Sequence, residues 1–239
     1  MRNHFQQQQA FPASQSASQA STIFLAKVFN WMAIGLGLTA IVAFWVTNSA
    51  AAQNMIFSNK MVFYGLIIGE LGMVIYLSTR IERMTASRAT LLFLLYSALN
   101  GATLSAVLLI YTAASVASAF LVAAGMFGTM AIYGTVTKKD LSSMGSFMFM
   151  GLIGMIIASV VNMFMGSAMI SWVVSAIGVV VFTGLTAYDV QKISKYGAGG
   201  ILENGEAAIK KGAIMGALTL YLDFINLFLS LLRLMGDRR

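Results

Sequence analysis

Seven long apolar runs, each about the length that a helix needs to cross the hydrocarbon core of a bilayer, dominate this 239-residue chain. Only 10% of the residues are charged and 59% are hydrophobic, far from the roughly 25% charged residues of soluble domains. The chain is therefore expected to be an all-α integral membrane protein with seven transmembrane helices. The runs are residues 28–47, 61–79, 89–111, 116–136, 144–165, 169–188 and 212–232.

The head of the chain differs from the rest. Residues 1–21 are rich in Gln, Ser and Ala and contain the only proline and the only histidine, Pro12 and His4. This segment has neither an apolar core nor the charged start of a signal peptide, so we expect a disordered polar tail that stays on the protein in the cytoplasm. Residues 22–239 are then expected to form a single membrane domain, with little chain left for a soluble enzyme.

The missing residue types exclude several kinds of chemistry. The chain has no cysteine, which excludes disulfides, thiolate metal sites and cysteine nucleophiles. Its single histidine lies in the polar head, so no imidazole is available in the membrane for proton relay or metal binding. A group that titrates near neutral pH inside the membrane must then be a carboxyl group. We expect neither an enzyme nor a bound cofactor.

Basic residues gather on one side of the predicted bundle. If the N-terminus is cytoplasmic, eleven Lys and Arg residues fall on the inner side and only Lys60 lies in the outer loops, as the positive-inside rule requires. The net charge of +7 is thereby explained by topology and by contact with anionic lipid headgroups, and no nucleic-acid partner is expected. The inner residues are Arg2, Lys27, Arg80, Arg83, Arg88, Lys138, Lys139, Lys192, Lys195, Lys210 and Lys211.

The last run conflicts with that rule, because a complete span would place three terminal arginines outside. A re-entrant segment would return them inside, since irregular backbone is tolerated at depth when protein surrounds it. We expect a complete seventh helix, because small and polar residues follow one helical face without a break at spacings of three and four. They are Gly212, Gly216, Thr219, Asp223, Asn226, Ser230 and Arg233.

Three of the eight acidic residues lie in or at the edge of the apolar runs: Glu70, Asp189 and Asp223. A carboxylate inside a membrane-length helix is costly in hydrocarbon, so it faces protein or water and by default indicates a functional site. Asp223 lies halfway along the last run, and Asp189 lies at the inner end of the preceding one. Glu70 fits equally well as a hydrogen-bonded packing residue or as part of a pathway.

Four segments carry a family resemblance. Residues 182–193, Phe-Thr-Gly-Leu-Thr-Ala-Tyr-Asp-Val-Gln-Lys-Ile, and residues 216–233, which include Tyr-Leu-Asp-Phe-Ile-Asn, closely resemble the signature segments of the Bax inhibitor family, also called the transmembrane Bax inhibitor motif family. Residues 111–115 and 133–141 resemble its bacterial branch. The similarity extends from about residue 26 to the end of the chain.

This resemblance implies a fold in which the C-terminal helix is central, between two layers of three helices. It also implies a pH-sensitive calcium leak in a bacterial inner membrane, with Asp189 and Asp223 as a hydrogen-bonded di-aspartyl sensor. In the family a basic residue at the inner end of the second helix is thought to latch the closed state. Arg80 and Arg83 are both candidates for that latch.

The physical chemistry of paired acids agrees with such a sensor. Two carboxyl groups in a low dielectric cannot both ionise easily, so they share a proton, and loss of that proton can bias helix packing. Calcium prefers six to eight oxygen ligands. Asp189 and Asp223, even with Thr186 and Asn226, form only a weak, transient calcium site, as permeation requires; Thr219 is a further candidate for the pathway or for packing.

Two other functions remain open at this stage. A proton-coupled cation exchanger could use the two aspartates as a relay, although the chain has no convincing internal repeat. A regulatory partner of other membrane proteins would fit the family's association with cell-death control. The expected partners are therefore the lipid bilayer, calcium, protons and, in the regulatory alternative, other membrane proteins.

Overall fold

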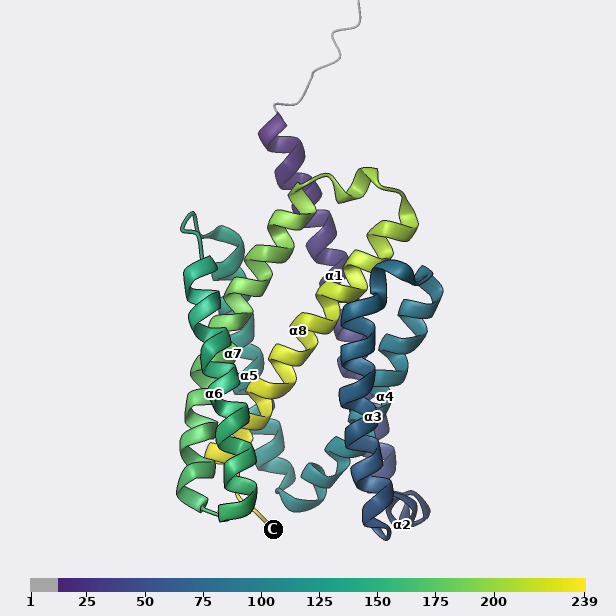
Figure 1. The fold of residues 1–239 in the computed structure, drawn as a ribbon, viewed down its shortest axis with the longest axis vertical. Helices are drawn as coiled ribbons and strands as arrows, with labels where there is room; N and C mark the ends of the chain where they lie inside the picture. Colours follow the sequence, from purple (N-terminus) through teal and green to yellow (C-terminus); the bar gives the residue numbers. More distant parts are fainter. Residues whose placement is uncertain (1–12) are drawn as a thin grey trace, which may run out of the picture.

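The computed structural model describes residues 13–239, which are almost entirely helical (Figure 1). Within this range seven helices are long and apolar enough to span a membrane, which confirms the predicted all-α membrane fold. Short 3-10 helices η1 (Ile81–Arg83) and η2 (Ile201–Glu203) follow α3 and α7. The helices are α1 (Ala13–Thr47), α2 (Ala50–Phe57), α3 (Lys60–Arg80), α4 (Ala86–Ile110), α5 (Ala113–Val136), α6 (Ser142–Met165), α7 (Ala168–Ala198) and α8 (Glu206–Met235), of which only α2 is too short to span.

The helix ends follow from local sequence. Ser, Thr and Asn side chains before the first turns accept hydrogen bonds from free backbone N–H groups, as with Thr85 before α4, Thr112 before α5 and Ser167 before α7. Gly166 ends α6 with a φ of 63°, a left-handed conformation that favours glycine. This turn makes α6 and α7 antiparallel neighbours.

The predicted boundary of the disordered head is wrong for residues 13–21. Those residues belong to α1, and the hydroxyl of Ser21 lies 2.7 Å from that of Ser194 in α7. The buried side chain of Phe24 packs against Gly197. The start of α1 is helical because it docks on the last turns of α7, a contact that composition does not reveal. Residues 1–12 of the predicted tail lie outside the described residues.

Helix α8 is the most buried of the spanning helices. Fifteen of its 30 residues are buried, whereas the only buried residue of α6 is Gly145. It contacts α1, α4, α5 and α7, and Figure 1 shows it crossing the molecule diagonally between α6 and α7 on one side and α3 and α4 on the other. The small and polar residues along one face of α8 are thereby buried or half-buried, except Arg233 at the end of the helix, which is exposed. The grouping of the other six spans into two layers stays a prediction.

The last segment crosses the whole bundle and is not re-entrant. It starts at the end of the bundle where α1 begins and finishes at the opposite end, the end at which α2 and the α4–α5 connection also lie (Figure 1). There the chain terminus pairs with that connection: Thr112 N–H donates to Asp237 C=O over 3.1 Å, and Arg239 N–H donates to Ile110 C=O over 2.8 Å. Arg238 also lies over the ring of Tyr111, 5.8 Å from its centroid. These contacts tie Arg238 and Arg239 to the α4–α5 connection.

Cysteine labelling tests this topology, and the natural absence of cysteine makes single labels unambiguous. We expect cysteines at Ser87 and Ser142 to react with a membrane-impermeant maleimide only from the cytoplasmic side. Cysteines at Ser58 and Asp237 should react only from outside, because α8 ends at the same face as α2. Reaction of the Asp237 cysteine from the cytoplasm would contradict the complete crossing by α8.

Candidate functional site

The structure brings Asp189 of α7 and Asp223 of α8 together. Their side chains lie within hydrogen-bonding reach of each other and interact electrostatically, and both line a cavity of about 540 Å³ between α6, α7 and α8. Asp223 is only 5% exposed, whereas Asp189 is half-buried. Two ionised carboxylates have no hydrogen to donate. A hydrogen bond between them therefore forms only when one of them carries a proton.

Small residues make this approach possible. A Cβ on Gly178 of α7 would lie 2.5 Å from the Oγ of Ser230 in α8, and one on Gly216 of α8 would lie 3.0 Å from Val28 of α1. Close backbone contact through small residues is a main source of helix association in membranes. Gly178 thus lets α7 and α8 approach closely, and Gly216 does the same for α8 and α1.

One oxygen of Asp223 has no donor. Its Oδ2 is buried and finds no hydrogen-bond partner among the described residues. An unpaired buried acceptor costs about 1–3 kcal/mol, and more when it is charged, so native structures rarely keep one without a reason. This oxygen is therefore free to receive a proton, a water molecule or a cation that enters the cavity.

A second cavity, of about 800 Å³, lies on the side of Asp189 toward the α7–α8 connection. Three residues line both cavities: Asp189, Lys192 and Thr219. The larger cavity also touches η2 and Glu82 of η1, which places it at the end of the bundle predicted to be cytoplasmic. The aspartate pair therefore lies beside open space that extends toward the α7–α8 connection.

The other candidate pathway residues divide into two groups. Thr219 and Asn226 line the cavity of the aspartates, and their donors are used by backbone carbonyls one turn earlier, which leaves side-chain oxygens for a ligand. Thr186 is fully buried and donates to Phe182 C=O over 2.7 Å. It lines neither cavity. Residues 13–239 contain no group of three or more His, Cys, Asp or Glu that could hold a metal ion.

The structure does not place the candidate latch residues beside the aspartates. Arg80 and Arg83 line a separate pocket with Arg88, and within residues 13–239 neither forms a salt bridge. The basic residue that acts on Asp189 is Lys192, one turn further along α7. In the sequence Lys192 served only to predict the topology, although its spacing of three residues from Asp189 indicates contact on one helical face.

Glu70 belongs to a different site. The hydroxyl of Thr103 donates to its Oε1 over 2.8 Å, and Asn100 Nδ2 donates to its Oε2 over 3.4 Å. Glu70 lines neither of the aspartate cavities. Of the two roles predicted for Glu70, these contacts support the hydrogen-bonded packing residue.

Comparison with known proteins gives a clear relationship. A model of the family described as "Inhibitor of apoptosis-promoting Bax1" matches residues 22–239. The chain belongs to the Bax inhibitor family. Inner membrane protein YbhL of Escherichia coli (strain K12) is 50% identical over 232 residues, which cover 96% of this chain and 99% of that protein. A protein of Borreliella burgdorferi is 47% identical over 216 residues, covering 90% and 92%, and protein RP147 of Rickettsia prowazekii is 45% identical over 219 residues, covering 90% of each chain.

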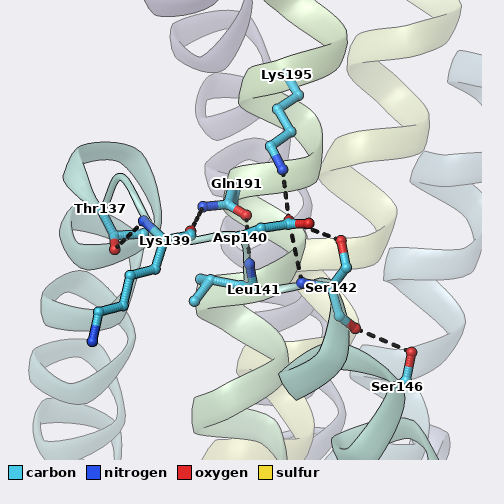
Figure 2. A network of polar contacts seen from close by, with 8 residues as sticks. All are labelled: Thr137, Lys139, Asp140, Leu141, Ser142, Ser146, Gln191 and Lys195. Carbon is cyan, nitrogen blue, oxygen red and sulfur yellow. Dashed lines mark hydrogen bonds and ion pairs between the residues drawn. The ribbon is translucent and has the colours of Figure 1, made fainter.

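In this Bax inhibitor family protein the α5–α6 connection is fastened to α7 two residues beyond Asp189 (Figure 2). The buried amide of Gln191 donates to Lys139 C=O over 2.8 Å and accepts from Leu141 N–H over 3.0 Å. The two hydrogen bonds that this amide makes with the backbone resemble a pair of hydrogen bonds in a β-sheet. These two bonds hold the α5–α6 connection against the C-terminal part of α7, two residues beyond Asp189.

An exposed ion pair lies beside Gln191. Lys195 donates to Asp140 Oδ1 over 2.8 Å, and Ser142 also donates to this carboxylate. The Lys195 ammonium, with the Ser142 hydroxyl, holds the pKa of Asp140 below its usual range. A carboxyl group whose pKa is lowered by folding stabilises the protein above its unfolded pKa, about 3.9, and the contribution is lost as the pH falls through the folded value.

These neighbouring contacts should differ in their effect on stability. Gln191→Leu leaves the N–H of Leu141 and the C=O of Lys139 without their partner. It should therefore lower the free energy of unfolding by about 1–3 kcal/mol. Asp140→Asn should have little effect at pH 7, because water screens exposed pairs, and this small effect should be lost as the pH falls through the lowered pKa of Asp140. Denaturation of both variants in detergent at several pH values checks this. Equal losses for both would contradict the assignment of Gln191 as the main fastening.

Proposed function

We propose that this protein is a pH-sensitive calcium leak channel of the bacterial inner membrane, gated by Asp189 and Asp223. The observation that carries the proposal is the meeting of these two carboxyl groups, on neighbouring spanning helices, at the wall shared by two cavities. The relative named an inner membrane protein in Escherichia coli supports the location. The activity proposed is transport, with no enzyme reaction and no cofactor; calcium, protons and the bilayer are its partners.

The larger cavity, of about 800 Å³, provides the first part of the pathway. It leads from the cytoplasmic end to Asp189 and Thr219, and the smaller cavity continues to Asp223 and Asn226. The oxygens along this route are too few for the six to eight ligands of a tight calcium site. A permeant ion must bind strongly enough to enter and weakly enough to leave, which a route with so few oxygens provides.

Beyond Asp223 the outer half of α8 is closed by aromatic packing. The ring centroid of Phe224 lies 5.4 Å from that of Phe120 and 5.6 Å from that of Phe127, and Phe228 lies 6.3 Å from Phe120. Both α8 rings are at most 8% exposed. Under the proposal this apolar segment is the barrier, and the packing described is the closed form.

Proton loss supplies the switch in this mechanism. While Asp189 and Asp223 share a proton, their hydrogen bond holds α7 against α8. When the proton leaves, two like charges face each other in a medium of low dielectric, where repulsion is several times stronger than in water. Lys192 neutralises part of the charge of Asp189, but Asp223 is buried and gains none of that contact, so α8 is the helix that must move.

The decisive experiment is calcium flux across proteoliposomes containing the purified protein, measured from pH 5 to 8. A gate that loses one proton changes its flux by up to about ten-fold per pH unit below its midpoint. Asp223→Asn keeps the size of the side chain but removes its titration, so this dependence should flatten. Asp237→Asn, in the exposed terminus, is the matched control and should behave as wild type.

A wild-type protein that passes no calcium at any pH or potential would overturn the channel. A regulatory partner of other membrane proteins would then be the better hypothesis, since the family description names the inhibition of another protein. Proton flux that depends on calcium, in place of a leak, would instead favour the exchanger.

The sharing of one proton has its own test. If Asp189 and Asp223 titrate as a pair, either single Asn variant destroys the shared equilibrium, and the double variant should lose no more pH response than each single one. Independent groups would give additive losses, each single variant keeping about half of the response. Flux measured in all four proteins decides between these patterns; additive losses would make Asp189 an ordinary cavity carboxylate.

A further inference from the structure

A chain of hydrogen bonds lies on the face of α8 opposite the aspartates. Tyr221 precedes Asp223 by two residues, which turns its side chain to the other side of the helix. Its hydroxyl lies 2.7 Å from that of Thr39 in α1 and donates to Asn100 Oδ1 in α4 over 3.1 Å. Tyr221 is the largest fully buried side chain of the described residues. A hydroxyl at this depth has no water to bond, so these two contacts are its partners.

The chain continues to Glu70 in α3. Asn100 Nδ2 and the Thr103 hydroxyl donate to the two oxygens of this carboxyl group. One assignment joins the whole route: Thr39 donates to Tyr221, Tyr221 to Asn100, and Asn100 to Glu70. The single hydrogen of Thr39 is then not available to the C=O groups of Gly35 and Ser97, which lie 2.9 and 2.8 Å from its Oγ1. Side chains of α1, α3, α4 and α8 are thus joined, although α3 itself packs mainly on α4.

Close packing of α1 on α4 fixes the position of Thr39. A Cβ on Gly101 would lie 2.5 Å from Thr39 C=O, and one on Gly35 would lie 2.6 Å from the ring of Phe93. The ring of Tyr221 meets those of Phe93 and Tyr96 edge to face, with centroids 6.1 and 5.9 Å apart. The tyrosine therefore sits in a shaped pocket, and its hydroxyl reaches Thr39 and Asn100 without adjustment of the backbone.

We propose that Tyr221 is a positioning residue that ties α8 to α1, α3 and α4 and stabilises the closed packing in which Asp223 meets Asp189. The inference rests on the proposed function. A rigid helix carries both groups, so a movement of α8 that separates the aspartates must also break the bonds of Tyr221. The hydrogen bonds of Tyr221 then set how much repulsion between Asp189 and Asp223 is needed before the channel opens.

The ionisable groups around this chain are few. Glu70 on α3 and Tyr96 on α4 act electrostatically on Tyr221, and on α1 its polar neighbour is the neutral Thr39. On the far side of α8, Asp223 faces Asp189, which in turn faces Lys192 on α7. The two sites are thus separated by the thickness of one helix, and Tyr221 does not itself belong to the aspartate pair.

Tyr221→Phe tests the proposal in the proteoliposome assay. The variant keeps the ring and its stacking but removes the hydroxyl, and the loss of a typical hydrogen bond shifts a two-state equilibrium about five-fold. Calcium flux should rise about five-fold at a pH where wild type is mostly closed, and unlike in Asp223→Asn the dependence on pH should remain. Tyr96→Phe is the matched control: its ring also packs on Tyr221, but within residues 13–239 its hydroxyl is not part of the chain.

The partner Thr39 provides a second variant. Thr39→Val preserves shape and removes the other hydroxyl. It should raise flux at least to a similar extent, because it also removes the contacts of this hydroxyl with Gly35 C=O and Ser97 C=O. The double variant with Tyr221→Phe should exceed Thr39→Val by little, since both substitutions break the Thr39–Tyr221 contact. Additive increases, unchanged flux in both variants, or a flattened pH response in Tyr221→Phe would each overturn the proposal. If Tyr221→Phe does not fold, Thr39→Val alone must show the increase.

A readout independent of flux separates this proposal from the channel itself. Spin labels on cysteines at Ser87 of α4 and Glu206 of α8, both exposed, report the distance between these helices. Tyr221→Phe should broaden this distance distribution or add a second population, and Tyr96→Phe should not. If wild type passes no calcium but Tyr221→Phe still shifts the distance distribution, the channel is refuted and the role of Tyr221 in tying α8 to its neighbours is kept. If Tyr221→Phe leaves the distribution unchanged, that role is refuted whether or not calcium passes.

Discussion

The cost of polar groups in hydrocarbon is the constraint on which the structure depends. Helix α8 carries a carboxyl group, a tyrosine hydroxyl and an amide at membrane depth, and each needs a partner that lipid cannot supply. Burial of fifteen of its residues meets this need. The other spanning helices can face lipid because their exposed residues are largely apolar. The position of α8 among its neighbours thus follows from its polar residues more than from its apolar ones.

Two faces of this helix have different chemistry. On one face Asp223 meets Asp189 but keeps one oxygen without a donor; on the other Tyr221 is fully bonded to Thr39 and Asn100. A satisfied polar network rigidifies a packed interior, whereas an unsatisfied one stores free energy that a ligand or proton can release. Under the two proposals, the aspartates are the movable part of the protein and Tyr221 is its restraint.

Much of the fold was predictable because the length and hydropathy of apolar runs indicate membrane-spanning helices. The seven spans and the complete crossing of α8 followed from apolar runs and from the unbroken spacing of polar residues. The boundary at residue 21 failed because the first turns of α1 are held by a distant segment, through Ser21 and Phe24 on α7. Aspartates were found from the cost of burying charge, while Lys192 was overlooked as a neighbour of Asp189.

The sequence by itself determined the class of protein, the number of spans and the acids that lie within the membrane, because these depend on composition and on spacing along one helix. Only the tertiary structure decided which side chains meet. Tyr221 carries no charge and looks like any aromatic residue in an apolar run, so its bonds to Thr39 and Asn100 could not be read from spacing. The separation of Arg80 and Arg83 from the aspartates was likewise set by helix packing, because contacts between helices depend on where small residues let backbones approach.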